Sequence, residues 1–310
     1  MFAFTRGRVT AGVVALGLVA SLAACSSGDP LSSGESGAPA DVKALTIGSQ
    51  GFAESDILAQ IYGQVLAANG YEIDYAEGIG SRETFIPALQ DGSIDLIPDY
   101  AGNLLYGADP DATATALDDI VAALPAALEP LDLVALDPAE ATDSDALVVT
   151  PEYAAANNLK TIGDLAPLSS SITLGANTEF EARWRDGLAS TYGFEGFQFK
   201  AIDDYGGPGT LSDLLANNIQ VADIYTTTPS IKQNKLVVLE DDKNLFAAQN
   251  VVPVLNVAFD SDEIAELLNS ISSELTTDDL LSLNEKSASD DKPSAAQVAE
   301  EWLKEKGLID

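Results

Sequence analysis

Short apolar runs alternate with helical apolar stripes along most of this chain. Residues 44–48 form the first run, and residues 57–66 carry apolar side chains at the spacing of one helix face. Further expected strands are 72–76, 94–97, 131–136, 146–149, 172–175, 197–202, 221–225, 236–239 and 251–257, and further expected helices are 82–90, 118–128, 179–192 and 211–217. Strands that alternate with helices pack as sheets covered by helices, so the sequence predicts an α/β fold with mostly parallel sheets.

The chain after residue 257 is expected to be helical. Small polar residues stand three positions before an acid or amide at three places, a spacing that satisfies free backbone N–H groups at a helix start. The pairs are Asp260 with Glu263, Thr276 with Asp279, and Ser294 with Gln297. The sequence therefore predicts three helices at the carboxyl end.

The first 43 residues have the features of an export signal and a tether. Arg6 and Arg8 precede an apolar run at 9–24, which is short for a spanning helix and ends in Leu-Ala-Ala before Cys25. This matches a bacterial lipobox, in which the cysteine is acylated. The competing hypothesis is a transmembrane anchor with an incidental cysteine.

The lipobox hypothesis divides the amino-terminal region into two parts. Residues 1–24 are the signal peptide, and residues 25–43 are a flexible linker, rich in Ser, Gly and Pro, that starts at the lipid attachment point Cys25. The body is then expected to lie outside the cytoplasm, anchored to the cell membrane.

Composition excludes several classes of function. Among 310 residues there are 15 Lys plus Arg, 49 Asp plus Glu, one Cys and no His, for a formal charge of −34. The charge argues against nucleic-acid binding, which needs clustered cations. Without histidine there is no Ser-His-Asp system, and the acidic pairs at 118–119 and 241–242 lack calcium-loop spacing. No cofactor and no metal are therefore expected.

Two segments of the chain resemble each other. Residues 90–100 and 217–225 both contain a helix end, a tight turn, a short apolar strand with an aspartate, and then a tyrosine, Tyr100 or Tyr225. Chance is one explanation, because such units are common in α/β proteins. The other is a pair of similar lobes, each presenting a tyrosine at the carboxyl ends of its strands, where ligands bind in open sheets.

Several motifs, in order and spacing, resemble one family. They are 47–54 (IGSQGFAE), 82–84 (RET), 87–102 (PALQDGSIDLIPDYAG), 179–194, 239–243 (LEDDK) and 252–254 (VPV). Together they are similar to the substrate-binding proteins of ABC importers for glycine betaine, choline and related quaternary amines. The similarity covers residues 44–310.

The resemblance implies a two-lobed periplasmic-binding-protein fold of type II, with a ligand cleft between the lobes. Two hinge crossings are expected near 142–147 and 250–255. Lobe 1 would then comprise 44–143 plus 254–310, and lobe 2 would comprise 144–253. The implied partners are a small amine ligand and ABC permease subunits in the membrane, and the chain is expected to be a monomer.

In this family tyrosines enclose the quaternary ammonium, which cannot donate a hydrogen bond and is held by aromatic faces. The resemblance places family tyrosines on Tyr100 and Tyr225 and a family threonine on Asn103. The arginine that binds a ligand carboxylate falls on Arg183, with Arg185 as a rival. Either arginine is alternatively a partner of a neighbouring acid, and Tyr100 is alternatively a core tyrosine.

Three expected ligand-binding positions depart from the family pattern. Gln50 replaces a lysine, while Asp145 and Gln249 replace tyrosines. Asp145 would supply an ionic partner for a cationic head. The resemblance therefore implies a choline- or glycine betaine-like ligand, or a different polar amine such as ergothioneine.

Two other functions compete with solute binding. A secreted carboxylate-based hydrolase would use Glu179 and Glu181, but their i,i+2 spacing on a helix points them apart. A sensor lobe of a receptor is the third hypothesis. The favoured one is a non-enzymatic solute-binding protein that closes its lobes on the ligand.

Overall fold

The computed structural model describes residues 44–310. The expected signal peptide, linker and Cys25 lie outside the described residues. Within that range, no helix is long and apolar enough to cross a membrane.

The first lobe is built on a five-stranded sheet in the order β2-β1-β3-β10-β4. β1 (Ala44–Gly48) pairs in parallel with β2 (Glu72–Ala76) and with β3 (Leu96–Tyr100). β10 (Val251–Asn256) runs antiparallel to β3 and to β4 (Leu133–Ala135). β10 therefore completes the sheet with a segment from the distant carboxyl-terminal part of the chain.

The second lobe has a five-stranded sheet of the same plan, in the order β7-β6-β8-β5-β9. β6 (Thr173–Ala176) lies parallel to β7 (Gln198–Ala201) and β8 (Val221–Asp223), whereas β5 (Leu147–Val149) is antiparallel to β8 and to β9 (Val237–Val238). The expectation of mostly parallel sheets is wrong, because both sheets are mixed. The antiparallel pairings come from β5 and β10, the strands next to the segments that cross between the lobes.

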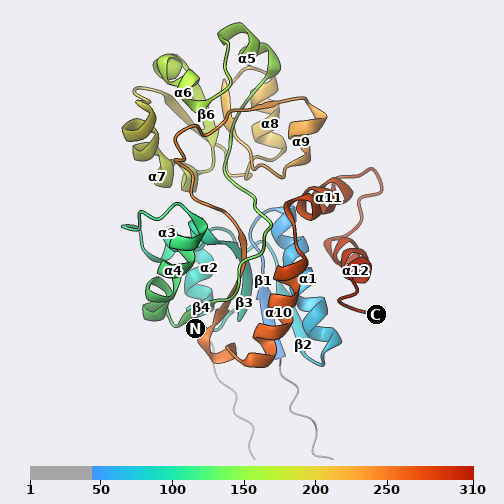
Figure 1. Cartoon of the computed structure of the whole chain (residues 1–310). Coiled ribbons are helices and arrows are strands. Elements are labelled where there is room, and N and C mark those ends of the chain that lie inside the picture. The colour runs from blue at the N-terminus through green and yellow to red at the C-terminus, as the bar shows by residue number, and fades with distance from the viewer. Residues whose placement is uncertain (1–43) are drawn as a thin grey trace, which may run out of the picture. The chain divides into compact units, whose positions relative to one another are not determined.

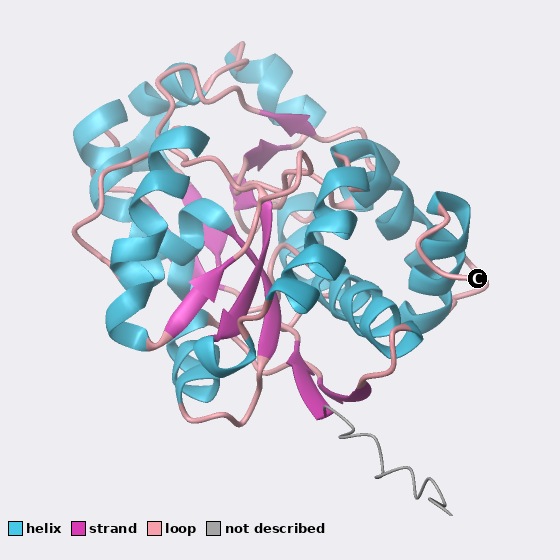
Figure 2. Ribbon diagram, turned by 60° about the horizontal axis from the view of Figure 1, so that its bottom comes forward, coloured by secondary structure: helices cyan, strands magenta, loops and turns pink. Residues whose placement is uncertain are grey.

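Helices cover both sheets, as Figures 1 and 2 show. The helices of the first lobe are α1 (Ala53–Ala68), α2 (Arg82–Gln90), α3 (Ala101–Ala108), α4 (Leu117–Leu128), α10 (Asp262–Glu274), α11 (Thr277–Ser287) and α12 (Ala295–Lys306). The helices of the second lobe are α5 (Pro151–Asn157), α6 (Ile162–Leu165), α7 (Thr178–Gly187), α8 (Pro208–Leu215) and α9 (Pro229–Gln233). Short 3₁₀ turns occupy Glu129–Leu131, Ala166–Ser171 and Val257–Phe259. The expected helix at 179–192 ends as a π-helical turn at Leu188–Tyr192.

The three carboxyl-terminal helices pack against α1. Capping boxes at Thr276 and Ser294 confirm two of the predicted helix starts. The prediction that Asp260 caps α10, the first of these three helices along the chain, is wrong. The hydroxyl of Ser261 accepts the hydrogen bond from Ile264 N instead, because Asp260 still belongs to the end of the preceding 3₁₀ turn.

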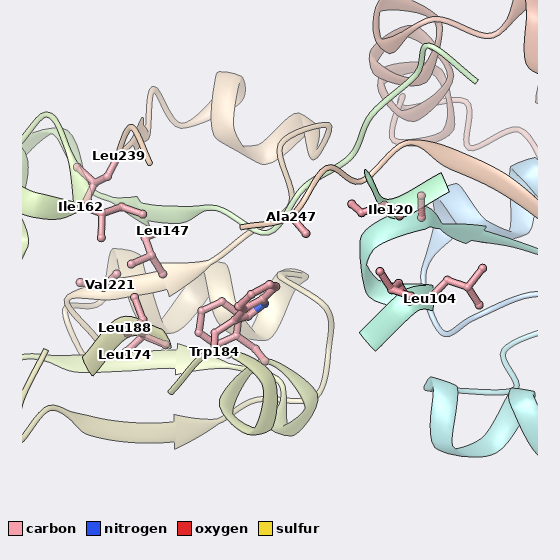
Figure 3. Packing of buried hydrophobic residues seen from close by; sticks show 14 of the residues in the cluster. Leu104, Ile120, Leu147, Ile162, Leu174, Trp184, Leu188, Val221, Leu239 and Ala247 are labelled. Atoms are coloured by element: carbon pink, nitrogen blue, oxygen red, sulfur yellow. The ribbon is translucent and has the colours of Figure 1, made fainter. Parts of the chain in front are cut away.

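Two chain segments pass between the lobes side by side (Figure 1). Thr142 and Asn250 form an antiparallel bridge, and Asp143 N donates a hydrogen bond of 3.1 Å to Gln249 O. Buried apolar side chains near these segments join the two lobes, from Leu104 and Ile120 to Leu147 and Trp184 (Figure 3). The two crossing segments therefore connect the sheets, and one cluster of buried apolar side chains beside them includes residues of both lobes.

Candidate ligand-binding site

Four aromatic rings lie close together at the cleft between the lobes, near the carboxyl ends of β3 and β8. Tyr100 is the last residue of β3, and Tyr225 follows β8 by two residues. Phe52 precedes α1, and its ring centroid lies 6.2 Å from that of Tyr100, 5.6 Å from that of Tyr205 and 5.6 Å from that of Tyr225. We call Phe52, Tyr100, Tyr205 and Tyr225 the aromatic cluster. It contains side chains from both lobes.

The sequence did not single out Phe52 or Tyr205 as site residues. Phe52 lies inside the first family-like motif, and Tyr205, in the loop before α8, has a positive φ of 54°. Gly51 explains the close approach of the Tyr205 ring, because a Cβ at Gly51 would lie 2.9 Å from Tyr205 Cε2. The Tyr205-Gly-Gly stretch and the Gly51-Phe52 pair are the sequence features that could have pointed to this contact.

A cavity of about 410 Å³ opens beside the aromatic cluster. Its walls include Phe52, Tyr205 and Tyr225, together with the carboxylates of Glu54 and Asp143. This volume falls within the usual range for small-molecule sites. The arrangement places aromatic faces and acidic groups around one space.

Glu54 is fully buried and accepts hydrogen bonds from three elements. Tyr100 Oη donates to Oε1 at 2.6 Å, while Thr227 Oγ1 at 2.6 Å and Asn284 Nδ2 at 2.5 Å both donate to Oε2. Burial raises the pKa of Glu54, since these neutral donors only partly replace water. Glu54 therefore links the end of β3, the second lobe and α11.

Asp143 lies in the first crossing segment, next to this group. Its Oδ1 accepts hydrogen bonds from Thr227 N at 3.0 Å and from Thr226 Oγ1 at 3.2 Å. Burial and then the nearby charge of Glu54 raise the pKa of Asp143. We call Glu54, Asp143 and the side chains that bond to them the Glu54 cluster. It contains two buried acids and no base among the described residues.

A chain of alternating charges crosses the cleft elsewhere. Arg82, on α2, reaches Asp99 at 2.5 Å and, in the other lobe, Glu179 at 2.7 Å. Arg183 lies 3.9 Å from Glu179 and 3.6 Å from Asp145. Burial opposes the ionisation of Glu179, but the guanidinium groups of Arg82 and Arg183 outweigh it and hold its pKa below the usual value. We call these five residues the ion-pair chain.

The remaining expected site residues lie around this chain. Gln50 Nε2 donates to Asp99 Oδ1 at 3.1 Å. Asn103 and Gln249 bond to each other twice, through Gln249 Nε2 to Asn103 Oδ1 at 2.9 Å and Asn103 N to Gln249 Oε1 at 3.1 Å. Asp145 accepts a hydrogen bond of 3.0 Å from Trp184 Nε1. All of these polar side chains are buried.

Arg183 and Arg185 lie in different surroundings, although they are two residues apart. The side chain of Arg183 is 11% exposed and belongs to the ion-pair chain. The side chain of Arg185 is 43% exposed, pairs with Glu181 and stacks on the ring of Phe197. Glu179 and Glu181 therefore bond to different arginines and do not form a catalytic carboxylate pair.

The fold defines a class of protein before any particular family. Among solved structures, one of a glycine betaine/carnitine/choline ABC transporter has a TM-score of 0.68 at 24% identity and covers 86% of this chain and all of that one. A choline-binding protein in complex with choline has a TM-score of 0.65 at 15% identity, over 87% of this chain and 91% of the other. The fold is that of two-lobed, type II periplasmic binding proteins.

Sequence comparison then identifies the family. Residues 43–305 match the family described as the substrate-binding domain of ABC-type glycine betaine transport systems, and the chain belongs to it. A glycine-betaine-binding protein of Pseudomonas aeruginosa is 29% identical over 288 residues, which are 87% of this chain and 90% of the relative. The family consists of extracytoplasmic proteins that deliver solutes to ABC permeases, so the expected class of function is confirmed.

Proposed function

We propose that this protein captures a small amine, choline- or glycine betaine-like, in the cavity beside the aromatic cluster. The observation that carries the proposal is that three rings of the aromatic cluster, those of Phe52, Tyr205 and Tyr225, border one space of about 410 Å³ together with Glu54 and Asp143, and that these residues come from both lobes. A methylated ammonium offers no hydrogen bond, so aromatic faces and nearby negative charge are the groups that bind it. No bond is made or broken in this function.

The expected site residues other than Arg185 each have a role in this proposal. Tyr100 and Tyr225 supply ring faces, joined by Phe52 and Tyr205. The polar side chains contact the rest of the ligand or hold those rings in place, and they are Gln50, Asn103, Asp145, Arg183 and Gln249. The burial of Arg183 and the exposed ion pair of Arg185 support Arg183 as the arginine at the cleft.

Ligand binding is proposed to close the two lobes about the crossing segments. Lobe 1 comprises 44–143 and the carboxyl-terminal part of the chain, and lobe 2 lies between them. We place the second boundary just before Val251, three residues earlier than the sequence suggested, because β10 begins there and pairs in the first sheet. The ion pair of Arg82 with Glu179 is one contact that closure would form.

The amino-terminal residues are proposed to export and anchor the protein, which is proposed to be a monomer. In this scheme residues 1–24 are removed, Cys25 carries the lipid, and 25–43 tether the body. The motif Leu-Ala-Ala-Cys and the single cysteine of the chain support it. Replacing Cys25 with Ser is expected to move the protein from the membrane fraction to the soluble fraction, and an unchanged distribution would contradict lipid anchoring.

Calorimetric titration tests the function directly. The full-length protein is titrated with choline, glycine betaine, carnitine, ergothioneine and a polyamine. We expect at least one amine to bind tighter than millimolar and to raise the thermal midpoint, because a ligand that binds only the folded state stabilises it. Failure of every amine to bind would refute the proposal.

A further inference from the structure

Two buried carboxyl groups, those of Glu54 and Asp143, meet in the wall of the cavity. Glu54 is 3% exposed and Asp143 is 6% exposed. The carboxyl group of Asp143 is one of the hydrogen-bonding partners of the Glu54 carboxyl group. Ionised carboxylates are acceptors only, so a hydrogen bond between these two groups requires that one of them carries a proton.

The elements around this pair supply neutral donors and further acids. The other titratable groups that face it are Tyr100 at the end of β3, Asp223 on β8 and Tyr225 after β8. Charged side chains on the neighbouring helices bond elsewhere, namely Asp56 of α1 with Ser49, Glu285 of α11 with Lys232, and Lys286 of α11 with Glu301. The arginines of the cleft belong to the ion-pair chain, and no base bonds to either acid of the pair among the described residues.

One shared proton is the state that such a pair favours. Two adjacent negative charges cost free energy where water is excluded and no cation compensates them. Carboxyl groups in this arrangement titrate as a unit and hold one proton between them. Burial acts on both acids in the same direction, since it raises the pKa of Glu54 and, together with the charge of Glu54, that of Asp143.

The pair lies where the two lobes meet. Glu54 is in the first turn of α1, and Asp143 is in the first crossing segment. Thr227, in the second lobe, donates a hydrogen bond to each of them, from Oγ1 to Glu54 and from its backbone N to Asp143. A change in the protonation of the pair therefore acts at the junction of the lobes.

A cation in the cavity would change the charge balance of the pair. The charged residues that line the cavity within the described chain are Glu54, Asp143 and Asp204. Asp204 is bonded to its own loop, through Gly207 N and Gly209 N. A quaternary ammonium against the rings of the aromatic cluster donates no hydrogen bond, but its positive charge favours the ionised form of both carboxyl groups and weakens their hold on the proton.

We propose that binding of the cationic amine displaces the proton shared by Glu54 and Asp143, so that the protein exchanges a proton for its ligand. This inference rests on the proposed function and adds a proton-binding site to it. The ligand-free pair holds one proton, the O–H bond breaks when the cation enters, and the proton passes to solvent water. The charge of the amine then takes the place of the charge of the proton.

The sign of the pH dependence follows from this exchange. Where the ligand-free pair holds its proton, each bound amine releases one, so the affinity for the amine rises with pH by up to about tenfold per pH unit. Where the ligand-free pair is already ionised, binding releases nothing and the affinity no longer changes with pH. The amine is therefore expected to bind most weakly at acidic pH.

A pH-stat measures the exchange directly, because the base needed to hold the pH constant equals the protons released. Choline, glycine betaine and carnitine are suitable probes, since none of them titrates appreciably between pH 5.5 and 8. The full-length protein receives each amine at saturating concentration across this range, and calorimetric titration gives Kd at the same pH values. We expect up to one proton to be released per bound amine and Kd to fall as the pH rises.

Binding without release of a proton at any of these pH values overturns the inference and leaves the proposed function intact. Uptake of a proton on binding overturns it as well. Failure of all three amines to bind overturns both the inference and the choline- or glycine betaine-like ligand of the proposed function. These measurements on the unaltered protein need no variant to fold.

Two substitutions test whether the pair is the source of the proton. Asp143→Asn keeps Oδ1 as the acceptor for Thr226 and Thr227 and removes one acid, so Glu54 should ionise more readily and the profile of proton release should move by about one unit or more to lower pH. Asp223→Asn is the matched control, because it alters another buried acid of the cleft and keeps Oδ1 as the acceptor for Ala146 N. Its profile should move less. An unmoved profile in Asp143→Asn, or an equal or larger movement in Asp223→Asn, assigns the proton to another group and overturns the inference.

Discussion

The ion-pair chain and the Glu54 cluster bury carboxylates at the same cleft by different means. In the ion-pair chain Glu179 lies within reach of two guanidinium groups, and its pKa is held below the usual value. In the Glu54 cluster only hydroxyl, amide and backbone donors face the acids, and the pKa values of Glu54 and Asp143 are raised. A counter-ion therefore opposes the effect of burial without always outweighing it, since burial still raises the pKa of Asp99, which is paired with Arg82, while two guanidinium groups hold the pKa of Glu179 below its usual value.

This difference suggests different roles for the two regions. In the ion-pair chain two arginines lie between three acids, and the chain joins the lobes through Arg82 and Glu179. The Glu54 cluster is uncompensated and borders the cavity. The first is suited to holding the lobes together, and the second to receiving the positive charge of a ligand.

Removing the shared base of the ion-pair chain is expected to have the largest effect. Arg82→Met leaves Asp99 without its counter-ion and Glu179 with only the more distant Arg183, and breaking a buried pair costs about 3–5 kcal/mol. Urea denaturation should show a loss of this size in the free energy of unfolding. The control is Arg185→Met, because the pair of Arg185 with Glu181 is partly exposed and contributes about 0–1 kcal/mol. Equal losses of unfolding free energy in the two variants would show that burial of the arginine does not determine how much its ion pair contributes to stability.

The Glu54 cluster is expected to respond to pH. Because its pKa in the folded protein is raised above 4.5, Glu54 takes up a proton on folding, and the stability of the ligand-free protein falls as the pH rises from 4.5 through the raised value. Asp143 is the other acid that faces it, and Tyr100, Thr227 and Asn284 are its neutral donors.

Glu54→Gln tests that dependence. An amide nitrogen cannot accept the donors that surround this position, so we expect a loss of about 1–3 kcal/mol near the acidic end of the range. The deficit should narrow as the pH rises, in thermal melts of both proteins between pH 4.5 and 8. The thermal stability of the surface variant Asp118→Asn should change with pH in parallel with that of the unaltered protein. Parallel curves for Glu54→Gln as well would show that the raised pKa does not contribute to stability.

The aromatic cluster gives a smaller, ligand-specific effect. Tyr225→Ala is expected to weaken binding of the preferred amine by about 1 kcal/mol or more, roughly fivefold to tenfold in Kd, through loss of one ring face. Tyr153→Ala, on α5 and outside the cluster, is the matched control. Calorimetric titration measures both, and unchanged affinity in Tyr225→Ala would remove this ring from the site.

A surface contact between the lobes should contribute least. Lys232, on α9 of the second lobe, pairs with Glu285 of α11 at 2.6 Å, but their side chains are 80% and 46% exposed. Lys232→Met is expected to change the free energy of unfolding by less than about 1 kcal/mol, and raising the salt concentration should reduce even that. A loss of unfolding free energy as large as that of Arg82→Met would mean that burial does not determine the difference in strength between these two ion pairs.

The regular elements were largely predictable, because each depends on local side-chain spacing. The strand at 72–76 and the helix at 82–90 have the expected bounds. The helices α3 and α5 were not predicted, since Ala101–Ala108 directly continues from a strand and Pro151–Asn157 is short. The strands β5 and β10 were predicted, but their antiparallel direction was not, because strand direction depends on how the chain returns from the other lobe.

The candidate site was predictable only in part. Tyr100 and Tyr225 were identified from their shared position after aspartate-bearing strands, and the structure brings both against Phe52. Tyr205 was missed, because its contact with Phe52 joins loops far apart in the sequence. The sequence also left open which of Arg183 and Arg185 faces the cleft. A shift of two residues on a helix places a side chain on a different face, so an uncertainty of two positions in the motif exchanges the two arginines.

The class of fold, the family-like motifs and the acidic character of the chain followed from the amino-acid sequence, because periodicity, motif order and composition are local or additive properties. Which acids have a counter-ion depends instead on the folded arrangement. Arg82 contacts acids from two lobes, whereas Glu54 meets only neutral donors and Asp143. The state of a buried charge depends on its neighbours in space and on its exclusion from water, and neither is a property of the neighbouring residues in the chain.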